Sequence, residues 1–150
     1  MTTSDLITAD LVDLGLDAPG KEVAIRSLAE RLVSAGRVTD LDVFLTDIAA
    51  REEQMATGLE GGIGIPHCRS AAVTTPTLAF GRSTAGVDFG APDGPAKLIF
   101  LIAAPEGGGS EHLKVLAAIA RRLVRAEFKQ HLLDATDPGE VADYIVSEVA

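Results

Sequence analysis

The chain has 150 residues, a length that fits one domain with a substantial core. Its 13 Lys and Arg residues face 22 Asp and Glu residues, and the net charge of −9 disfavours nucleic acid as a partner, because phosphates would be repelled. The single Cys68 has no partner for an internal disulfide, and the N-terminus does not resemble a signal peptide. No apolar run approaches the roughly 20 residues that span a bilayer. These features favour a cytoplasmic protein.

The N-terminal third predicts a strand followed by a helix. Alternating apolar residues predict a strand over residues 11–16. Apolar residues at helical spacing predict a helix over residues 24–35, and Gly36 is a natural stop.

A second helix is expected to begin at Thr39. Its hydroxyl can cap the helix, with Asp42 at the spacing of a capping box. On this helix Phe44, Ile48 and Arg51 fall on one stripe. The guanidinium of Arg51 should therefore lie against the protein, at the C-terminal end of the buried stripe.

A polar connection over residues 52–61 leads to a segment that delivers a histidine. Ile63, Ile65 and His67 alternate, which indicates a short strand with the imidazole on the same side as two apolar side chains. Pro66 cannot donate to a ladder, so strand pairing is expected to stop where His67 emerges. The histidine is then expected at a strand end, on a rim.

The rest of the chain alternates between strand and helix patterns. The continuous apolar run over residues 98–104, bounded by prolines, is typical of a central strand covered on both faces. This alternation predicts a single-domain α/β fold with a mixed, mostly parallel sheet of about five strands flanked by helices. The further expected elements are a strand over 78–81, a turn-rich segment with a short edge strand over 86–94, a loop over 107–109, and helices over 110–124, 127–134 and 138–150.

Two histidines follow predicted strands. Ser110 is expected to cap a helix whose first turn carries His112, directly after the central strand. Loops after strand ends are where sites gather in open α/β sheets, so His67 and His112 are expected to converge. The helix N-terminus and Arg51 would add positive charge. This combination is suited to phosphoryl transfer through a nucleophilic ring nitrogen.

The same segments resemble a known family, the fructose/mannitol-type enzyme IIA domain of the bacterial phosphoenolpyruvate-dependent sugar phosphotransferase system, and most of all its fructose-specific component. The resemblance covers nearly the whole chain, and two histidine motifs about 45 residues apart make it specific. The segments that carry it are Arg51-Glu52-Glu53, Thr57-Gly58, and residues 62–67, 100–106 and 110–116.

The resemblance implies a cytoplasmic phosphocarrier without cofactor or metal. His67 would be phosphorylated at Nε2 by the phosphohistidine of the carrier HPr, and would pass the group to a cysteine of a fructose-type IIB domain, which phosphorylates the sugar during uptake through IIC. It further implies that His112 steadies the phosphoryl group, that Arg51 neutralises its charge, and that Thr57 and Ser110 support it. The sequence departs from the family at Gly61, where relatives commonly carry Asn or an acidic residue, so a polar contact from that side chain is either missing or supplied by Glu60.

Two other functions remain open on sequence. A nitrogen-related regulatory IIA protein would have the same histidine site but would act by binding partners. A zinc hydrolase would need His67, Cys68 and His112 as ligands. Successive residues of a strand face opposite ways, which argues against Cys68 as a partner of His67 and favours a small filler. His131 reads as a solvated helix residue.

Overall fold

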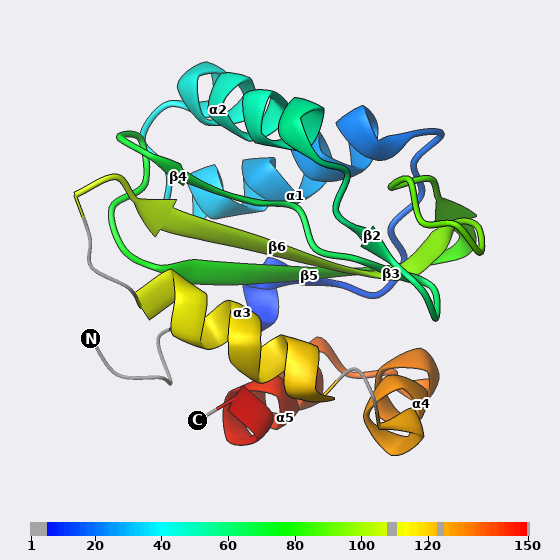
Figure 1. Cartoon of the computed structure of the whole chain (residues 1–150). Helices are drawn as coiled ribbons and strands as arrows, with labels where there is room; N and C mark the ends of the chain where they lie inside the picture. Colours follow the sequence, from blue (N-terminus) through cyan, green and yellow to red (C-terminus); the bar gives the residue numbers. More distant parts are fainter. Residues whose placement is uncertain (1–5, 108–110, 123–124, 150) are drawn as a thin grey trace.

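The computed structural model describes residues 6–107, 111–122 and 125–149 as a sheet between two layers of helices (Figure 1). Helices α1 and α2 cover one face, and helices α3, α4 and α5 cover the other (Figure 1). None of the described helices is long and apolar enough to cross a membrane. The helices are α1 (Lys21–Ser34), α2 (Leu41–Gln54), α3 (Glu111–Arg122), α4 (Ala126–Asp134) and α5 (Pro138–Val149).

Six strands pair within the described residues, in the order β1-β5-β6-β3-β2, with β4 also paired to β6. The pairs β1–β5, β3–β6 and β4–β6 are parallel, whereas β5–β6 and β2–β3 are antiparallel. The predicted α/β class with a mixed sheet is confirmed. The strands are β1 (Val12–Asp13), β2 (Gly58–Leu59), β3 (Ile63–Gly64), β4 (His67–Ser70), β5 (Thr77–Val87) and β6 (Ala96–Pro105).

Strand β6 is the centre of the core, as its apolar run predicts. Every residue from 98 to 104 is buried, and the ring of Phe100 lies between those of Phe80 and Phe128, with centroids 5.1 and 6.4 Å away. Phe80 comes from β5 and Phe128 from α4, so these rings join the sheet to the helical layer beneath it. Such aromatic pairs add about 0.5–1.5 kcal/mol each beyond the area that they bury.

Three boundary predictions need correction. The strand predicted over residues 11–16 is a 3-10 turn and the short β1, because the Asp13 carboxylate accepts the backbone N–H of Gly15 and turns the chain. The predicted edge strand over 86–94 is absent as a separate element, since β5 continues to Val87.

The start of α2 also differs from the prediction, because the helix begins at Leu41. Asp40, not Thr39, caps the helix by accepting the backbone N–H of Val43 at 3.2 Å. The Thr39 hydroxyl donates instead to the carbonyl of Ala72, which ties this loop to the segment after β4. The predicted stop of α1 is confirmed, because Gly36 adopts a φ of 75°.

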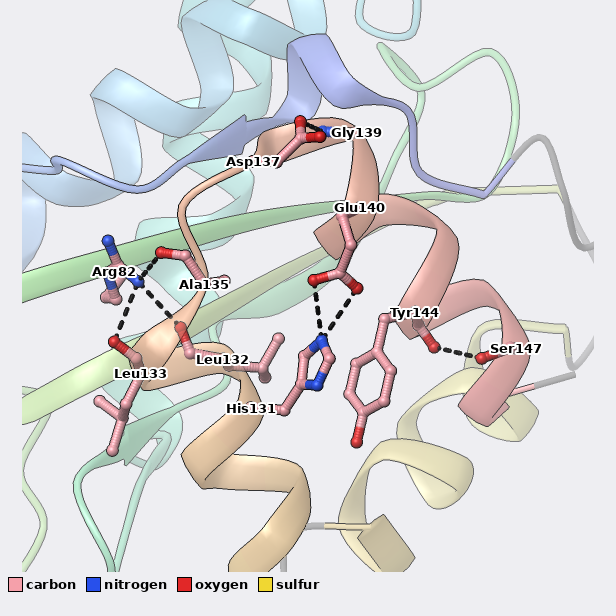
Figure 2. A network of polar contacts seen from close by, with 10 residues as sticks. All are labelled: Arg82, His131, Leu132, Leu133, Ala135, Asp137, Gly139, Glu140, Tyr144 and Ser147. Atoms are coloured by element: carbon pink, nitrogen blue, oxygen red, sulfur yellow. Dashed lines mark hydrogen bonds and ion pairs between the residues drawn. The ribbon is translucent and has the colours of Figure 1, made fainter.

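Arg82 of β5 fastens the C-terminal end of α4 to the sheet (Figure 2). Its Nη1 donates to the carbonyls of Leu132, Leu133 and Ala135 at 3.0, 3.1 and 2.6 Å, and its Nε donates to the carbonyl of Leu14. A fixed cation at the negative end of a helix satisfies carbonyls that have no intrahelical partner.

His131 lies on α4 and is partly exposed, as the sequence suggests, but its ring also has fixed partners on α5. Its Nε2 contacts both carboxylate oxygens of Glu140 at 2.8 and 2.9 Å, and its ring stacks on Tyr144 with centroids 3.7 Å apart (Figure 2). These contacts join α4 to α5, which gives His131 a structural role.

Candidate functional site

The segment that carries His67 is one strand interrupted by Pro66. Strands β3 and β4 pair with β6 in the same register, since Gly64 lies opposite Ile99 and His67 lies opposite Ile102. The ladder is broken only at residues 65 and 66, because proline has no N–H to donate. The prediction that pairing stops at His67 is wrong: pairing resumes there.

At this interruption the backbone of Ile65 contacts the histidine and the segment before β2, not β6. The carbonyl of Ile65 lies 2.7 Å from His67 Nδ1. The backbone N–H of Ile65 donates to the carbonyl of Thr57 at 3.0 Å. A carbonyl only accepts, so Nδ1 must carry the proton. The neutral ring then has a free lone pair on Nε2.

Arg51 meets the other side of the half-buried imidazole from the last turn of α2. Its Nη2 lies 3.3 Å from His67 Nε2, and its Nη1 donates to the carbonyl of Met55 at 3.1 Å. A guanidinium is always a donor, so this contact also requires Nε2 to be the acceptor. The sequence correctly predicts that Arg51 points toward the protein, and both partners of the ring favour the same tautomer.

Glu52, next to Arg51, belongs to a motif segment, but the sequence assigns it no role in the site. Its carboxylate accepts the hydroxyl of Thr57, and its Oε2 lies 3.7 Å from the ammonium of Lys21 on α1. Both Glu52 and Thr57 are buried. The available signal was its place four residues after Ile48 on the buried stripe of α2, where a carboxylate is unusual.

Cys68 follows the histidine but belongs to the core. Burial, with the nearby carboxylate of Asp47 as a smaller cause, raises the pKa of the Cys68 thiol to about 12. A thiol that stays protonated is a poor nucleophile and a poor metal ligand. Among the residues whose side chains are described, no group of three metal-binding side chains occurs.

The remaining predicted site residues are described only in part. Residues 108–110, including Ser110, fall outside the described residues, and so does the side chain of His112, whose backbone lies in the first turn of α3. Gly61 adopts a φ of 95°, and its N–H donates to Asp93 at 2.9 Å, which accounts for glycine in place of a polar residue.

The local geometry is thus a neutral imidazole whose Nε2 carries no proton, with a cation beside that atom. A family model described as "Phosphoenolpyruvate-dependent sugar phosphotransferase system, EIIA 2" matches residues 5–148. A "PTS system fructose-specific EIIA component" from Haloferax volcanii is 41% identical over 147 residues, which are 97% of this chain and 96% of that protein.

Solved structures agree with this assignment. The nitrogen regulatory protein IIA-Ntr from Neisseria meningitidis superposes with a TM-score of 0.84 and 27% identity, covering 98% of each chain. The mannitol IIA protein from Escherichia coli, solved in complex with phosphorylated IIB, superposes with a TM-score of 0.79 and 27% identity over 94% of this chain and 97% of that one. The chain belongs to the EIIA 2 family of the phosphoenolpyruvate-dependent sugar phosphotransferase system.

Proposed function

We propose that this chain is a fructose-type phosphocarrier that uses His67 Nε2 as its nucleophile. The observation that carries the proposal is the pair of contacts on the imidazole: the Ile65 carbonyl holds the proton on Nδ1, and Arg51 lies at Nε2. The lone pair is therefore on the nitrogen that faces a fixed cation. A phosphoryl group arriving there would find positive charge beside its oxygens.

The transfer proceeds in two steps. The Nε2 lone pair attacks the phosphorus of a phosphohistidine on HPr, and an N–P bond forms at His67 as the N–P bond of the donor breaks. A cysteine thiolate of a fructose-type IIB domain then attacks the same phosphorus, and the His67 ring leaves with its lone pair restored. The proton stays on Nδ1 and is donated to the Ile65 carbonyl throughout, so the ring does not need to change its tautomer.

Three other residues of the proposed site act on the phosphoryl group bound to His67 Nε2. Arg51 neutralises the charge of the phosphoryl group, and His112, carried on the first turn of α3, steadies it. Ser110, which precedes that helix in the sequence, supports it. The complex of the mannitol relative with phosphorylated IIB supports a IIB domain as the acceptor. The IIC protein would complete uptake in the membrane while this domain works in the cytoplasm.

A nitrogen-related regulatory role is the second candidate. The structure of the IIA-Ntr protein from Neisseria meningitidis supports it through its TM-score of 0.84. The fructose-type branch is favoured because the Haloferax volcanii relative is 41% identical over 97% of the chain, whereas a nitrogen regulatory protein from Pseudomonas aeruginosa is 39% identical over only 64% of it.

Labelled phosphoenolpyruvate with enzyme I and HPr tests the function. The wild-type chain should take up label that is stable to alkali and labile to acid, as a phosphohistidine is, and should lose it when a fructose-type IIB domain is added. His67→Ala should take up none, whereas His131→Gln, a change of a histidine outside the site, should behave as the wild type. Label that loads but never leaves for IIB would favour the regulatory role, and absence of loading would refute both.

A further inference from the structure

Glu52 is a buried carboxylate that the phosphoryl-transfer scheme does not use. Its side chain is only 4% exposed, and its Oε2 has no hydrogen-bond partner among the described residues, although Lys21 lies 3.7 Å away as an ion-pair partner. Burying a charge with so little compensation disfavours folding, and an apolar side chain of similar size is often better tolerated in such a place. A buried group of this kind needs an explanation.

One chain of hydrogen bonds leads from Glu52 to the Nδ1 side of the histidine. The carboxylate accepts the hydroxyl of Thr57. The carbonyl of Thr57 accepts the N–H of Ile65, and the carbonyl of Ile65 accepts the Nδ1 proton of His67. The backbone that fixes the tautomer is therefore held at one end by Glu52.

A second route leads to the Nε2 side. The carbonyl of Met55 accepts from Arg51 Nη1, which leaves Nη2 directed at His67. Met55 and Thr57 belong to the same short link between α2 and β2. By holding Thr57 against the end of α2, Glu52 closes this link and so fixes where the Met55 carbonyl lies.

We propose that Glu52 is a positioning residue that sets both polar contacts of the His67 imidazole through the link of residues 55–57. This inference rests on the proposed function of His67. It also accounts for Thr57, whose hydroxyl is engaged by Glu52 and which acts on the ring through its backbone carbonyl. Lys21 supplies the countercharge, and because its side chain is one-third exposed it can turn to water when Glu52 is replaced.

The test compares Glu52→Met with Glu52→Gln. Methionine has a similar volume but no acceptor for Thr57, whereas glutamine keeps an acceptor oxygen and removes only the charge. Glu53→Met is the matched control, because it changes the exposed neighbour on the same helix turn. Nitrogen-15 NMR of the His67 ring reports the tautomer without any phosphoryl donor, and rapid-quench loading from phosphorylated HPr reports the rate.

We expect Glu52→Met to keep or raise the melting temperature, to show a mixture of ring tautomers, and to load about 10- to 100-fold more slowly, as a displaced nucleophile does. The final stoichiometry of label and the KM for phosphorylated HPr should stay within about twofold of the wild type, since Glu52 is buried away from any docking partner. Glu52→Gln should keep the wild-type tautomer and load within about threefold of its rate.

A stable Glu52→Met protein with the wild-type tautomer and rate would overturn the proposal. If that variant does not fold, Thr57→Val removes the same hydrogen bond and Thr57→Ser restores the hydroxyl; equal tautomers and rates in these two would overturn it as well. Failure of the wild type itself to accept label would instead count against the proposed function, and the tautomer measurement would still decide the role of Glu52.

Discussion

Replacing Arg51 by methionine should slow phosphoryl loading onto His67 without unfolding the protein. The Arg51 Nη2 lies 3.3 Å from His67 Nε2, so its charge faces a phosphoryl group built on that atom. Two unit charges about 4 Å apart interact by roughly 4 kcal/mol at an effective dielectric constant near 20. Arg51 is partly exposed, and screening reduces the expected loss to about 2–3 kcal/mol. This loss corresponds to a rate about 30- to 150-fold lower.

Single-turnover loading from phosphorylated HPr, followed by rapid quench, measures this effect. Arg26→Met is the control, because it removes the same charge from an exposed position of α1 where the partner is Glu30. Arg51→Lys keeps the charge but cannot contact the Met55 carbonyl and His67 at once, so its loss should be intermediate, about tenfold. An Arg51→Met protein that loads within about threefold of the wild type would refute the charge argument.

Three further predictions concern stability. Arg82→Met should lower the free energy of unfolding by about 2–3 kcal/mol, because it leaves the carbonyls at the end of α4 without their cation. Gly58→Ala should lower it by about 1–3 kcal/mol, since an added Cβ would lie 2.6 Å from the backbone nitrogen of Ala91 and 2.7 Å from the carbonyl oxygen of Phe89. Between about pH 8 and pH 10, the free energy of unfolding of the wild type should fall by about 1.4 kcal/mol more than that of Cys68→Ala. The reason is that the pKa of the thiol is 9.0 in the unfolded chain but about 12 in the folded chain, so only the unfolded chain loses the proton in this range.

Urea unfolding measures all three. Arg82→Lys should recover part of the loss, since a lysine keeps the charge but not the fork of donors, and an Arg82→Met protein as stable as the wild type would show that the contacts contribute nothing. Gly15→Ala is the control for Gly58→Ala, because nothing lies within 4 Å of its added Cβ; equal effects at the two positions would contradict the steric reason. If the free energy of unfolding of the wild type and of Cys68→Ala fell equally between pH 8 and pH 10, the pKa of the thiol would not be raised in the folded state.

The sequence predicts the fold class well because its strongest patterns are those of buried elements. The apolar run over residues 98–104 can only be covered on both faces, and it is the central strand β6. The stripe of Phe44, Ile48 and Arg51 predicts the two buried apolar residues of α2 and the inward direction of the guanidinium, although Glu52 is the third buried residue of the helix. Periodicity reports which side chains are buried, so it places such elements reliably.

The errors arise where a single local hydrogen bond decides. Thr39 and Asp40 are both good caps, and the tie between Thr39 and the Ala72 carbonyl, 33 residues away, selects Asp40. Pro66 predicts the end of the ladder, but strands β3 and β4 keep the same register with β6 on both sides of it. Neither the contact nor the register can be read from neighbouring residues.

In the candidate site, too, the sequence identifies the motif residues but not the single hydrogen bonds that hold them. The motifs name His67 and Arg51, and the structure brings these two together at 3.3 Å. The proton on Nδ1 depends on a backbone carbonyl, which has no sequence signature, and the contact of Glu52 with Thr57 depends on how the link after α2 folds back. The partners that fix the position of the imidazole are therefore harder to predict than the motif residues themselves.

The position of the phosphoryl group on the ring tests the central claim most directly. Proton–phosphorus correlation NMR of the loaded protein distinguishes the two nitrogens, because phosphorus on Nε2 couples to both carbon-bound ring protons, whereas phosphorus on Nδ1 couples to one. We predict coupling to both ring protons of His67. A phosphoryl group on Nδ1 of His67, or on another histidine, would contradict the account.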